Sequence, residues 1–298
     1  MGCGVVHGGP WIRGLSRCEP LRPGGYWGGD SGPGEDVKED RVDSWLELQE
    51  ALFAGSWNES LSRFRPSFAF RGVPDARHDL STSLNRRQGD FAAHERDLLR
   101  AFQKYARSGS KPCETVWDWL ALAQHHGLPT RLLDWTFSPY VALHFLTEDP
   151  EQYDIDGVVW CVDYRETNRL LPKPLQGQLR EEGADVFTAK MLATVAGDLP
   201  TFDRLTKHPF VLFFEPPSLD DRIVNQFALF SVMNGPMLRL DTFLESQKRG
   251  VRRLIVPASL KWEVRDKLDQ ANITERVLFP GLDGLSRWLR RYYSSRQQ

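Results

Sequence analysis

The sequence predicts the α+β fold class. Short apolar stretches typical of strands are mixed with amphipathic stretches typical of helices. A doubly wound sheet would show a regular repeat of strand and helix units, and we find no such repeat. The 298 residues, 41% of them hydrophobic, suffice for one large domain or two small ones. Since no second domain is evident, we expect one domain at residues 41–298, after a Gly- and Pro-rich tail at residues 1–40 that is disordered or extended.

The expected elements run through the whole domain. Helices are expected at residues 42–53, 91–106, 115–123, 139–146, 259–270 and 282–293, and strands at 68–71, 157–162, 210–215, 227–232, 251–256 and 274–279. The polar, helix-prone residues 164–198 are expected to cover the sheet or to act as a lid. In the helix at 91–106, the stripe predicts that Phe91, Leu98, Leu99, Phe102 and Tyr105 are buried, with Glu95 mostly solvated.

Residues 124–139, QHHGLPTRLLDWTFSP, form the central segment of the chain and concentrate its polar chemistry. Gly127 is placed to end the preceding helix in a left-handed conformation. Ser138 and Pro139 are the cap and first residue of the next helix, so residues 131–135 are expected to be extended. The start of that helix offers free N–H groups, and Arg131 lies seven residues before Ser138, which favours an anionic ligand.

Structural roles are open for the same residues. Arg131 and Asp134 can pair with each other in a buried network, Trp135 can belong to the core, and the histidines can cap carbonyl groups. Arg71, at the end of an apolar strand, either pairs with an internal carboxylate or holds an anion, and we favour the anion.

Composition narrows the classes of function. A net charge of −2 gives no general attraction to nucleic acid. The four scattered cysteines indicate neither a zinc cluster nor a disulfide framework, so a cytoplasmic location is expected. No apolar run reaches transmembrane length. A metal site is not expected, because His125 and His126 would point about 100° apart on a helix.

The central segment, together with Phe70-Arg71-Gly72 and a Ser-Leu followed by Arg, resembles the FRG domain family. The likeness is good from Phe68 to Leu146 and looser out to Gln226 and residues 278–285. A further, looser resemblance is to ADP-ribosyltransferases, which implies a mixed, largely antiparallel and split sheet, flanked by helices, that binds NAD in a cleft. On that resemblance Arg71 holds phosphates or ribose, Thr136 and Ser138 order the cleft, and Gln226 takes the third position.

Gln226 departs from what such a transferase needs. Cleavage of the nicotinamide bond passes through an oxocarbenium-like state that a carboxylate stabilises, and an amide carries no charge. Glu215, Asp134 or Asp221 would have to supply it, or the protein binds a nucleotide without turning it over.

We therefore expect a polar cleft for a nucleotide or another phosphate-bearing ligand, with NAD as a candidate substrate and no required cofactor. The candidate catalytic residues are Arg71, His125, Asp134, Ser138 and Gln226. The candidate binding residues are Arg71, Gly72, Gln124, His126, Thr130, Arg131, Trp135 and Thr136. The alternative is a non-catalytic module that recognises RNA or a phosphorylated partner through the same side chains.

Overall fold

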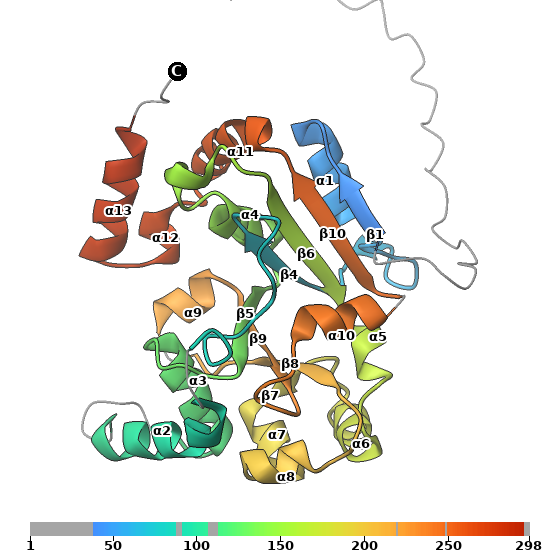
Figure 1. The fold of residues 1–298 in the computed structure, drawn as a ribbon. Coiled ribbons are helices and arrows are strands. Elements are labelled where there is room, and N and C mark those ends of the chain that lie inside the picture. The colour runs from blue at the N-terminus through green and yellow to red at the C-terminus, as the bar shows by residue number, and fades with distance from the viewer. Residues whose placement is uncertain (1–37, 88–90, 107–112, 219, 248, 295–298) are drawn as a thin grey trace, which may run out of the picture. The chain divides into compact units, whose positions relative to one another are not determined.

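The computed structural model describes residues 38–87, 91–106, 113–218, 220–247 and 249–294, which lie in one compact unit (Figure 1). Its centre is an eight-stranded mixed sheet in the order β1-β10-β6-β4-β5-β9-β8-β7. The strands are β1 (Lys38–Arg41), β4 (Phe68–Val73), β5 (Leu132–Thr136), β6 (Gly157–Asp163), β7 (Phe187–Thr188), β8 (Val211–Glu215), β9 (Ala228–Met233) and β10 (Val251–Val256). A separate hairpin contains β2 (Trp57–Asn58) and β3 (Arg63–Phe64).

The sheet is mostly antiparallel and is weakly joined at its middle. Parallel pairs occur at its two ends, between β1 and β10 and between β7 and β8. β4 pairs with β6 over six residues, whereas β4 and β5 share a single pair, Phe70 with Thr136. The predicted α+β class with a mixed, largely antiparallel sheet is therefore confirmed. We call the junction of β4 and β5, where one residue pair joins the strands, the split.

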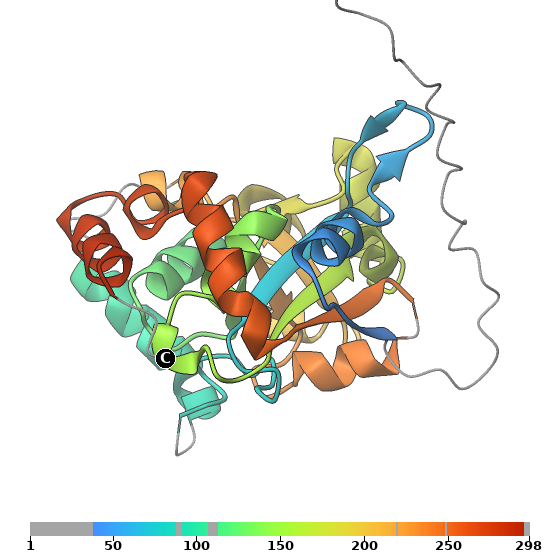
Figure 2. The same ribbon diagram turned by 90° about the horizontal axis from the view of Figure 1, so that it is seen from above.

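Helices surround both halves of the sheet (Figures 1 and 2). They are α1 (Trp45–Phe53), α2 (Phe91–Ala106), α3 (Val116–His125), α4 (Pro139–Leu146), α5 (Tyr164–Asn168), α6 (Lys173–Glu182), α7 (Ala189–Val195), α8 (Leu199–Asp203), α9 (Asp221–Asn225), α10 (Leu240–Ser246), α11 (Ala258–Gln270), α12 (Glu275–Leu278) and α13 (Leu282–Tyr292). No helix of the described ranges is both long and apolar enough to cross a membrane.

Three apolar clusters attach these helices to the sheet. One joins α1, α4 and α11 to β4, β6 and β10, with Phe70 and Leu143 among its members. A second joins α3, α6, α7 and α8 to the other half of the sheet, around Trp117 and Phe214. The third contains Trp135 and Trp160, on the sheet face that α10 covers. The first two clusters therefore give each half of the sheet its own helices, and the cluster under α10 spans both halves.

Most expected elements are present within one to three residues of their predicted ends, and the exceptions have physical reasons. The predicted strand at residues 274–279 is wrong, because these residues contain α12. The side-chain amides of Asn225 and Gln226 donate to the carbonyls of Val277 and Leu278. Those carbonyls are thereby satisfied outside any sheet.

Two further differences concern α2 and the N-terminal boundary. Leu99 is buried as expected, but Tyr105 is 76% exposed and Glu95 only 4% exposed, so the predicted solvation of Glu95 is wrong. The side chain of Phe91 lies outside the described residues. β1 spans the predicted boundary between residues 40 and 41, and the rest of the predicted tail lies almost entirely outside the described ranges.

Gly72 sets how closely α4 packs on β4. A Cβ atom at this position would lie 1.8 Å from the carbonyl oxygen of Ala142 and 3.0 Å from the backbone N of Leu146. Both obstacles are backbone atoms of α4, so no side-chain rotation can relieve the contact. A glycine is therefore required here by the approach of the helix.

We predict that Gly72→Ala lowers the free energy of unfolding by at least about 1–3 kcal/mol, because the helix must move away from the strand. Urea denaturation would measure this change. Gly177→Ala is the matched control: it lies within α6, and its Cβ would meet only the Arg180 side chain at 4.0 Å. That variant should be neutral or more stable by about 0.5–1 kcal/mol. Equal effects of the two substitutions would contradict the contact.

Candidate functional site

The local structure of the central segment follows its sequence. Thr115 and Asp118 form a capping box at the start of α3. At its end Gly127 has φ +80°, and the N–H groups of Gly127 and Leu128 donate to the carbonyls of Gln124 and Ala123 in a Schellman arrangement. Ser138 caps α4, with Pro139 as its first residue. The predicted order of helix end, extended stretch and helix start is confirmed.

Arg71 lies at the split between β4 and β5. Its Nη1 donates to the main-chain carbonyl of Asp134, and its Nε is buried without a hydrogen-bond partner. Among the described residues, no carboxylate forms an ion pair with this guanidinium. A buried donor without an acceptor is costly, and the described residues leave the Nε of Arg71 unsatisfied.

Arg86 stands close enough to Arg71 for the two charges to interact. Burial lowers the pKa of the Arg71 guanidinium, the charge of Asp134 opposes this, and the charge of Arg86 lowers the pKa further. Arg86 donates through Nη1 to the carbonyl of Ser81 at 2.9 Å. The charge of Arg86 also acts on Asp79, which pairs with Arg239 at 3.1 Å. The positive charge of Arg86 thus acts on the guanidinium of Arg71.

Arg86 was not among the expected site residues. It is the Arg that follows Ser83-Leu84, and so it belongs to a pattern that the family resemblance already contained. That position was the available signal. The motif position alone does not predict that the chain from residue 73 to residue 87 folds back and brings the charge of Arg86 close enough to act on Arg71.

Asp134 connects Arg71 to the end of α3. Its side chain is exposed, and its Oδ2 accepts from Nε2 of Gln124 at 2.9 Å. The Oε1 of Gln124 in turn accepts from the hydroxyl of Thr130, whose own N–H donates to the Ser83 hydroxyl at 3.0 Å. Arg71, Asp134, Gln124 and Thr130 are thus brought together as expected, with Thr130 buried and Asp134 facing solvent.

The two histidines at the end of α3 differ in their surroundings. His125 Nε2 lies 2.6 Å from Oδ2 of Asp220, while His126 is exposed and its ring stands edge-on to that of His125. Because a carboxylate only accepts, Nε2 carries the proton, and Nδ1 of a neutral His125 ring is left as an acceptor. Among the described residues, no group of His, Cys, Asp or Glu side chains is suited to hold a metal ion.

Arg131 does not have the predicted ligand-binding role in this geometry. Its Nε donates to Glu95 Oε1 at 2.7 Å, and its Nη2 donates to both Glu95 and Asp203, the latter at 3.1 Å. Nη1 donates to the other oxygen of Asp203. Burial alone would lower the pKa of Arg131, but the bonds and charges of these two carboxylates outweigh it and raise that pKa. The pairing with Asp134, considered from the sequence, is replaced by partners from α2 and α8.

Trp135 and Gln226 are also structural here. For Trp135 this is the core role that the sequence left open, and for Gln226 it differs from the catalytic position expected. The Trp135 indole is buried against Phe213, and its Nε1 donates to the Ser231 hydroxyl at 2.9 Å, so it cannot stack on a ligand. Gln226 is buried, with its amide donating to the carbonyl of Leu278 at 3.0 Å. The main-chain carbonyl of Gln226 accepts from the Thr136 hydroxyl at 2.7 Å.

The hydroxyls of Thr136 and Ser138 therefore bond to the backbone of this chain, and this replaces the predicted role of ordering a ligand cleft. The Thr136 hydroxyl is buried and also accepts from the N–H of Ser138 at 3.0 Å. The Ser138 hydroxyl accepts from the N–H of Val141 at 3.4 Å. Both hydroxyls are used to fix the start of α4, so the expected catalytic role of Ser138 has no support in this arrangement.

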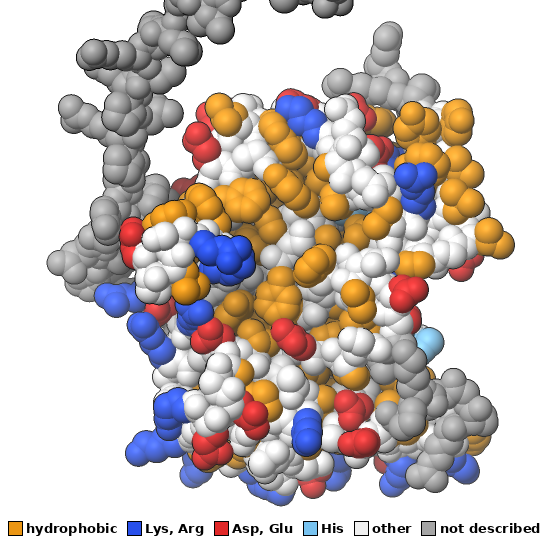
Figure 3. Space-filling view, turned by 180° about the vertical axis from the view of Figure 1, so that it is seen from behind, with side chains coloured by type: hydrophobic (Ala, Val, Ile, Leu, Met, Phe, Trp, Pro, Cys, Tyr) orange, Lys and Arg blue, Asp and Glu red, His pale blue; other side chains and the backbone are white. Residues whose placement is uncertain are grey.

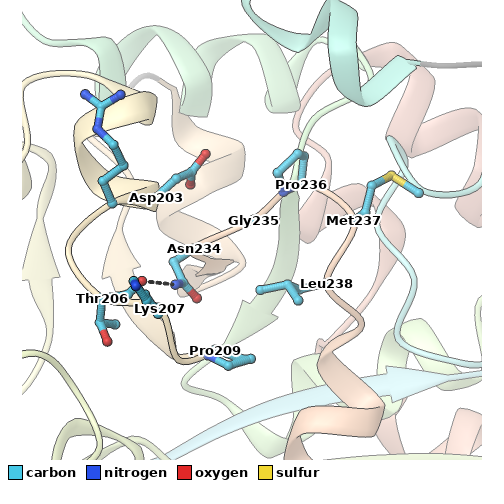
Figure 4. A pocket seen from close by; sticks show the side chains of 10 residues that line it. Asp203, Thr206, Lys207, Pro209, Asn234, Gly235, Pro236, Met237 and Leu238 are labelled. Carbon is cyan, nitrogen blue, oxygen red and sulfur yellow. Dashed lines mark hydrogen bonds between the residues drawn. The ribbon is translucent and has the colours of Figure 1, made fainter.

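An open hollow of about 770 Å³ has no residue of the central segment in its lining (Figure 4). It is lined by residues 203–209 and 234–238, among them Asp203, Lys207, Asn234 and Leu238. Asp203 belongs both to this lining and to the Arg131 cluster. None of Arg71, His125 and Asp134 lines it, so the hollow is separate from the arginines at the split.

We predict that Arg131→Ala lowers the free energy of unfolding by about 3–5 kcal/mol, because Glu95 would remain buried without its partner. Urea denaturation would measure the loss. The control is Arg100→Ala, which removes an exposed pair with Asp97 at 2.8 Å on the same helix as Glu95 and should cost less than about 1 kcal/mol. A loss for Arg131→Ala no larger than for the control would show that the cluster is not structural.

Comparisons with known proteins bear on the same part of the chain. The model of the FRG domain family matches residues 66–155, a range that includes β4, α2, α3, β5 and α4. Neither the curated proteins nor the solved structures gave a match. The matched range contains Arg71, Arg86 and the whole central segment. The chain therefore contains an FRG domain, and the family predicted from its motifs is confirmed.

Proposed function

We propose that this FRG domain binds a phosphate-bearing ligand, a nucleotide in particular, at the split between β4 and β5. The observation that carries the proposal is the Arg71 guanidinium, which has one main-chain carbonyl as acceptor, a buried Nε without a partner and no carboxylate ion pair among the described residues. The positive charge of Arg86 also acts on it. A bound phosphate would compensate both charges and accept from the unpartnered Nε of Arg71.

The surrounding groups suit a ligand larger than phosphate alone. His126 and Asp134 are exposed, and Asp220 orients the ring of His125. We propose that these side chains supply donors, an acceptor and a carboxylate to a ligand held by Arg71. Such a mixture matches a nucleotide, whose phosphates are anionic and whose ribose and base both donate and accept.

We predict that wild-type protein binds NAD or ADP and that Arg86→Gln weakens binding by about tenfold or more, since it removes one charge-assisted contact. Isothermal titration calorimetry with NAD, ADP and inorganic phosphate would measure this. Arg86 is exposed, so its replacement should leave folding intact, whereas the buried donors of Arg71 make its variants harder to interpret. Weaker binding at higher salt is also expected.

Arg100→Gln is the matched control, because it removes an exposed arginine of α2 from the same domain. It should bind NAD as the wild type does. Absence of binding to all three anions, or binding that Arg86→Gln leaves unchanged, would contradict the proposal. If a short RNA or a phosphopeptide binds in an Arg86-dependent way and no nucleotide does, the non-catalytic recognition module becomes the function.

The finer proposal is that the ligand is NAD and that the domain transfers its ADP-ribose group. In that reaction the bond from ribose C1′ to the nicotinamide nitrogen breaks, and its electron pair leaves with nicotinamide. A nucleophilic acceptor then forms the new bond to C1′ and loses its proton. A nearby carboxylate stabilises the positive charge that develops on the ribose.

Asp134 is the best placed of the three acids considered for this role. Its charge acts on Arg71, whereas Glu215 lies near Tyr164 and Asp221 is exposed in the first turn of α9. Gln226 is excluded from it by its buried amide, which is bonded to Leu278. His125 Nδ1 is an acceptor suited to take the proton from the attacking group.

We predict that Asp134→Asn retains NAD binding within about threefold but reduces nicotinamide release by about 100-fold or more, the loss typical of removing one stabilising group. Asparagine can still accept from Gln124, so the local hydrogen bond survives. Chromatographic assay of nicotinamide would measure the rate, with Asp221→Asn as the control. Binding without nicotinamide release by the wild type would retain the binding proposal and reject the transferase.

A further inference from the structure

His144 of α4 is a titratable side chain that lies completely inside the fold. It is 0% exposed, and its Nδ1 lies 2.9 Å from Nη1 of Arg265 on α11. A guanidinium group only donates, so Nδ1 is the acceptor and carries no proton. The proton of the neutral ring is then on Nε2, which is buried without a hydrogen-bond partner among the described residues. The contact with Arg265 therefore requires the neutral form of His144.

Arg265 belongs to a group of two arginines and two carboxylates that joins α11, α12 and α13. It forms an ion pair with Asp269 at 3.0 Å, and Arg291 of α13 donates to both oxygens of Asp269, at 2.8 Å each. Arg291 also donates to both oxygens of Glu275, the first residue of α12. These four charges balance while His144 is neutral. A proton on the ring would add a buried positive charge that has no partner.

The same surroundings lower the pKa of His144. Burial has the largest effect, the charges of Arg265 and Arg291 add to it, and the charge of Glu275 opposes it, so the pKa falls from 6.5 to about 3. A ring that reaches water regains its ordinary pKa. Between these two values only an opened state takes up the proton, so a falling pH favours opening.

The other ionisable groups near the ring do not reproduce this response. Burial alone would raise the pKa of Glu275, but its bonds to Arg291 lower it from 4.5, so the stability it contributes is lost only below about pH 4.5. Burial raises the pKa of the Tyr153 hydroxyl, which stays protonated. Burial also raises the pKa of Glu148, whose protonation favours the closed state and opposes the effect of His144.

α12 and α13 are the elements whose movement would bring the ring into contact with water. They lie at the edge of the molecule, where hydrophobic side chains gather in the view from behind (Figures 1 and 3). The ring of Phe279, directly after α12, lies 6.2 Å from that of His144. Leu282 of α13 is 80% exposed, whereas Leu143 of α4 and Val264 of α11 are buried in the apolar cluster on the sheet. The outer helix pair can therefore move while α4 and α11 stay in place.

We propose that His144 is an acid-sensitive switch: the neutral ring keeps α12 and α13 attached to α4 and α11, and its protonation stabilises a state in which this helix pair is detached. Detachment would also separate the side-chain amides of Asn225 and Gln226 from their acceptors in α12. The change would thus reach α9, beside the central segment. The switch does not depend on a ligand at Arg71.

Hydrogen–deuterium exchange of the full chain at pH 7 and pH 5, corrected for intrinsic exchange rates, would measure the opening. A histidine that ionises at 6.5 only in the opened state raises the opening constant by about 25-fold over this interval, and Glu148 offsets part of it. Protection of residues 275–292 should therefore fall by about tenfold or more. It should also stay below that of β6 at pH 5, since equal values would mean that the whole domain unfolds and would overturn the proposal.

His144→Asn separates the switch from general acid sensitivity. Its Oδ1 can take the acceptor position of Nδ1 but binds no proton in this range, so the fall in protection should shrink to about twofold or less. The control is His94→Asn, on the exposed face of α2 and 3.9 Å from Asp97, which should behave as the wild type does. An equal fall in the wild type and in His144→Asn would overturn the proposal.

An NMR titration of the histidine rings in the wild type is a second test that needs no variant. While α12 and α13 are attached, the His144 ring should keep its proton on Nε2 alone from pH 7 to pH 5. A ring that ionises near pH 6.5 while the protection of α12 and α13 stays constant would overturn the proposal, because the protonated ring would then be compatible with the closed state.

Discussion

The backbone contact between Gly72 and α4 is the constraint on which the arrangement of the site depends. α4 begins three residues after β5 ends and then lies against β4, where its Ala142 carbonyl occupies the space that a Cβ at position 72 would need. β4 keeps a full ladder with β6 but shares one residue pair with β5. The carbonyl of Asp134 accepts from the side chain of Arg71, because no β4 backbone pairs with it. The placement of a helix on a strand thus leaves an arginine at the split.

Two arginines of the family motifs, Arg71 and Arg131, have opposite surroundings. The contrast distinguishes Arg131, which stabilises the fold, from Arg71, which we assign to ligand binding. Arg131 is bonded by two carboxylates that use its three nitrogens, so its charge is compensated and its geometry fixed. Arg71 has one carbonyl acceptor and a second arginine nearby. A buried ion pair with both partners present is stable but chemically inert, whereas an uncompensated guanidinium gains from any anion that reaches it.

Local signals made much of the fold predictable. Caps and glycines around α3 and α4 act within a few residues, and the sequence located them correctly. The partners of Arg131 could not be found in this way, because Glu95 and Asp203 lie 36 and 72 positions away. The amphipathic pattern of α2 predicts that Glu95 faces solvent, since the pattern carries no information on a distant arginine. The same limit explains residues 274–279, whose carbonyls are satisfied by amides 52 positions earlier.

α9 and the residues beside it connect the central segment to α12 and α13. Asp220, its cap, holds His125, and the carbonyl of Gln226 accepts from Thr136 of the central segment. The amides of Asn225 and Gln226 hold α12, which in turn holds Arg291 of α13. Contiguity of this kind transmits a signal only if the connecting element has two arrangements. The main-chain carbonyl of Gln226 accepts from Thr136 and its side-chain amide donates to Leu278, so the described structure shows one arrangement of this connection.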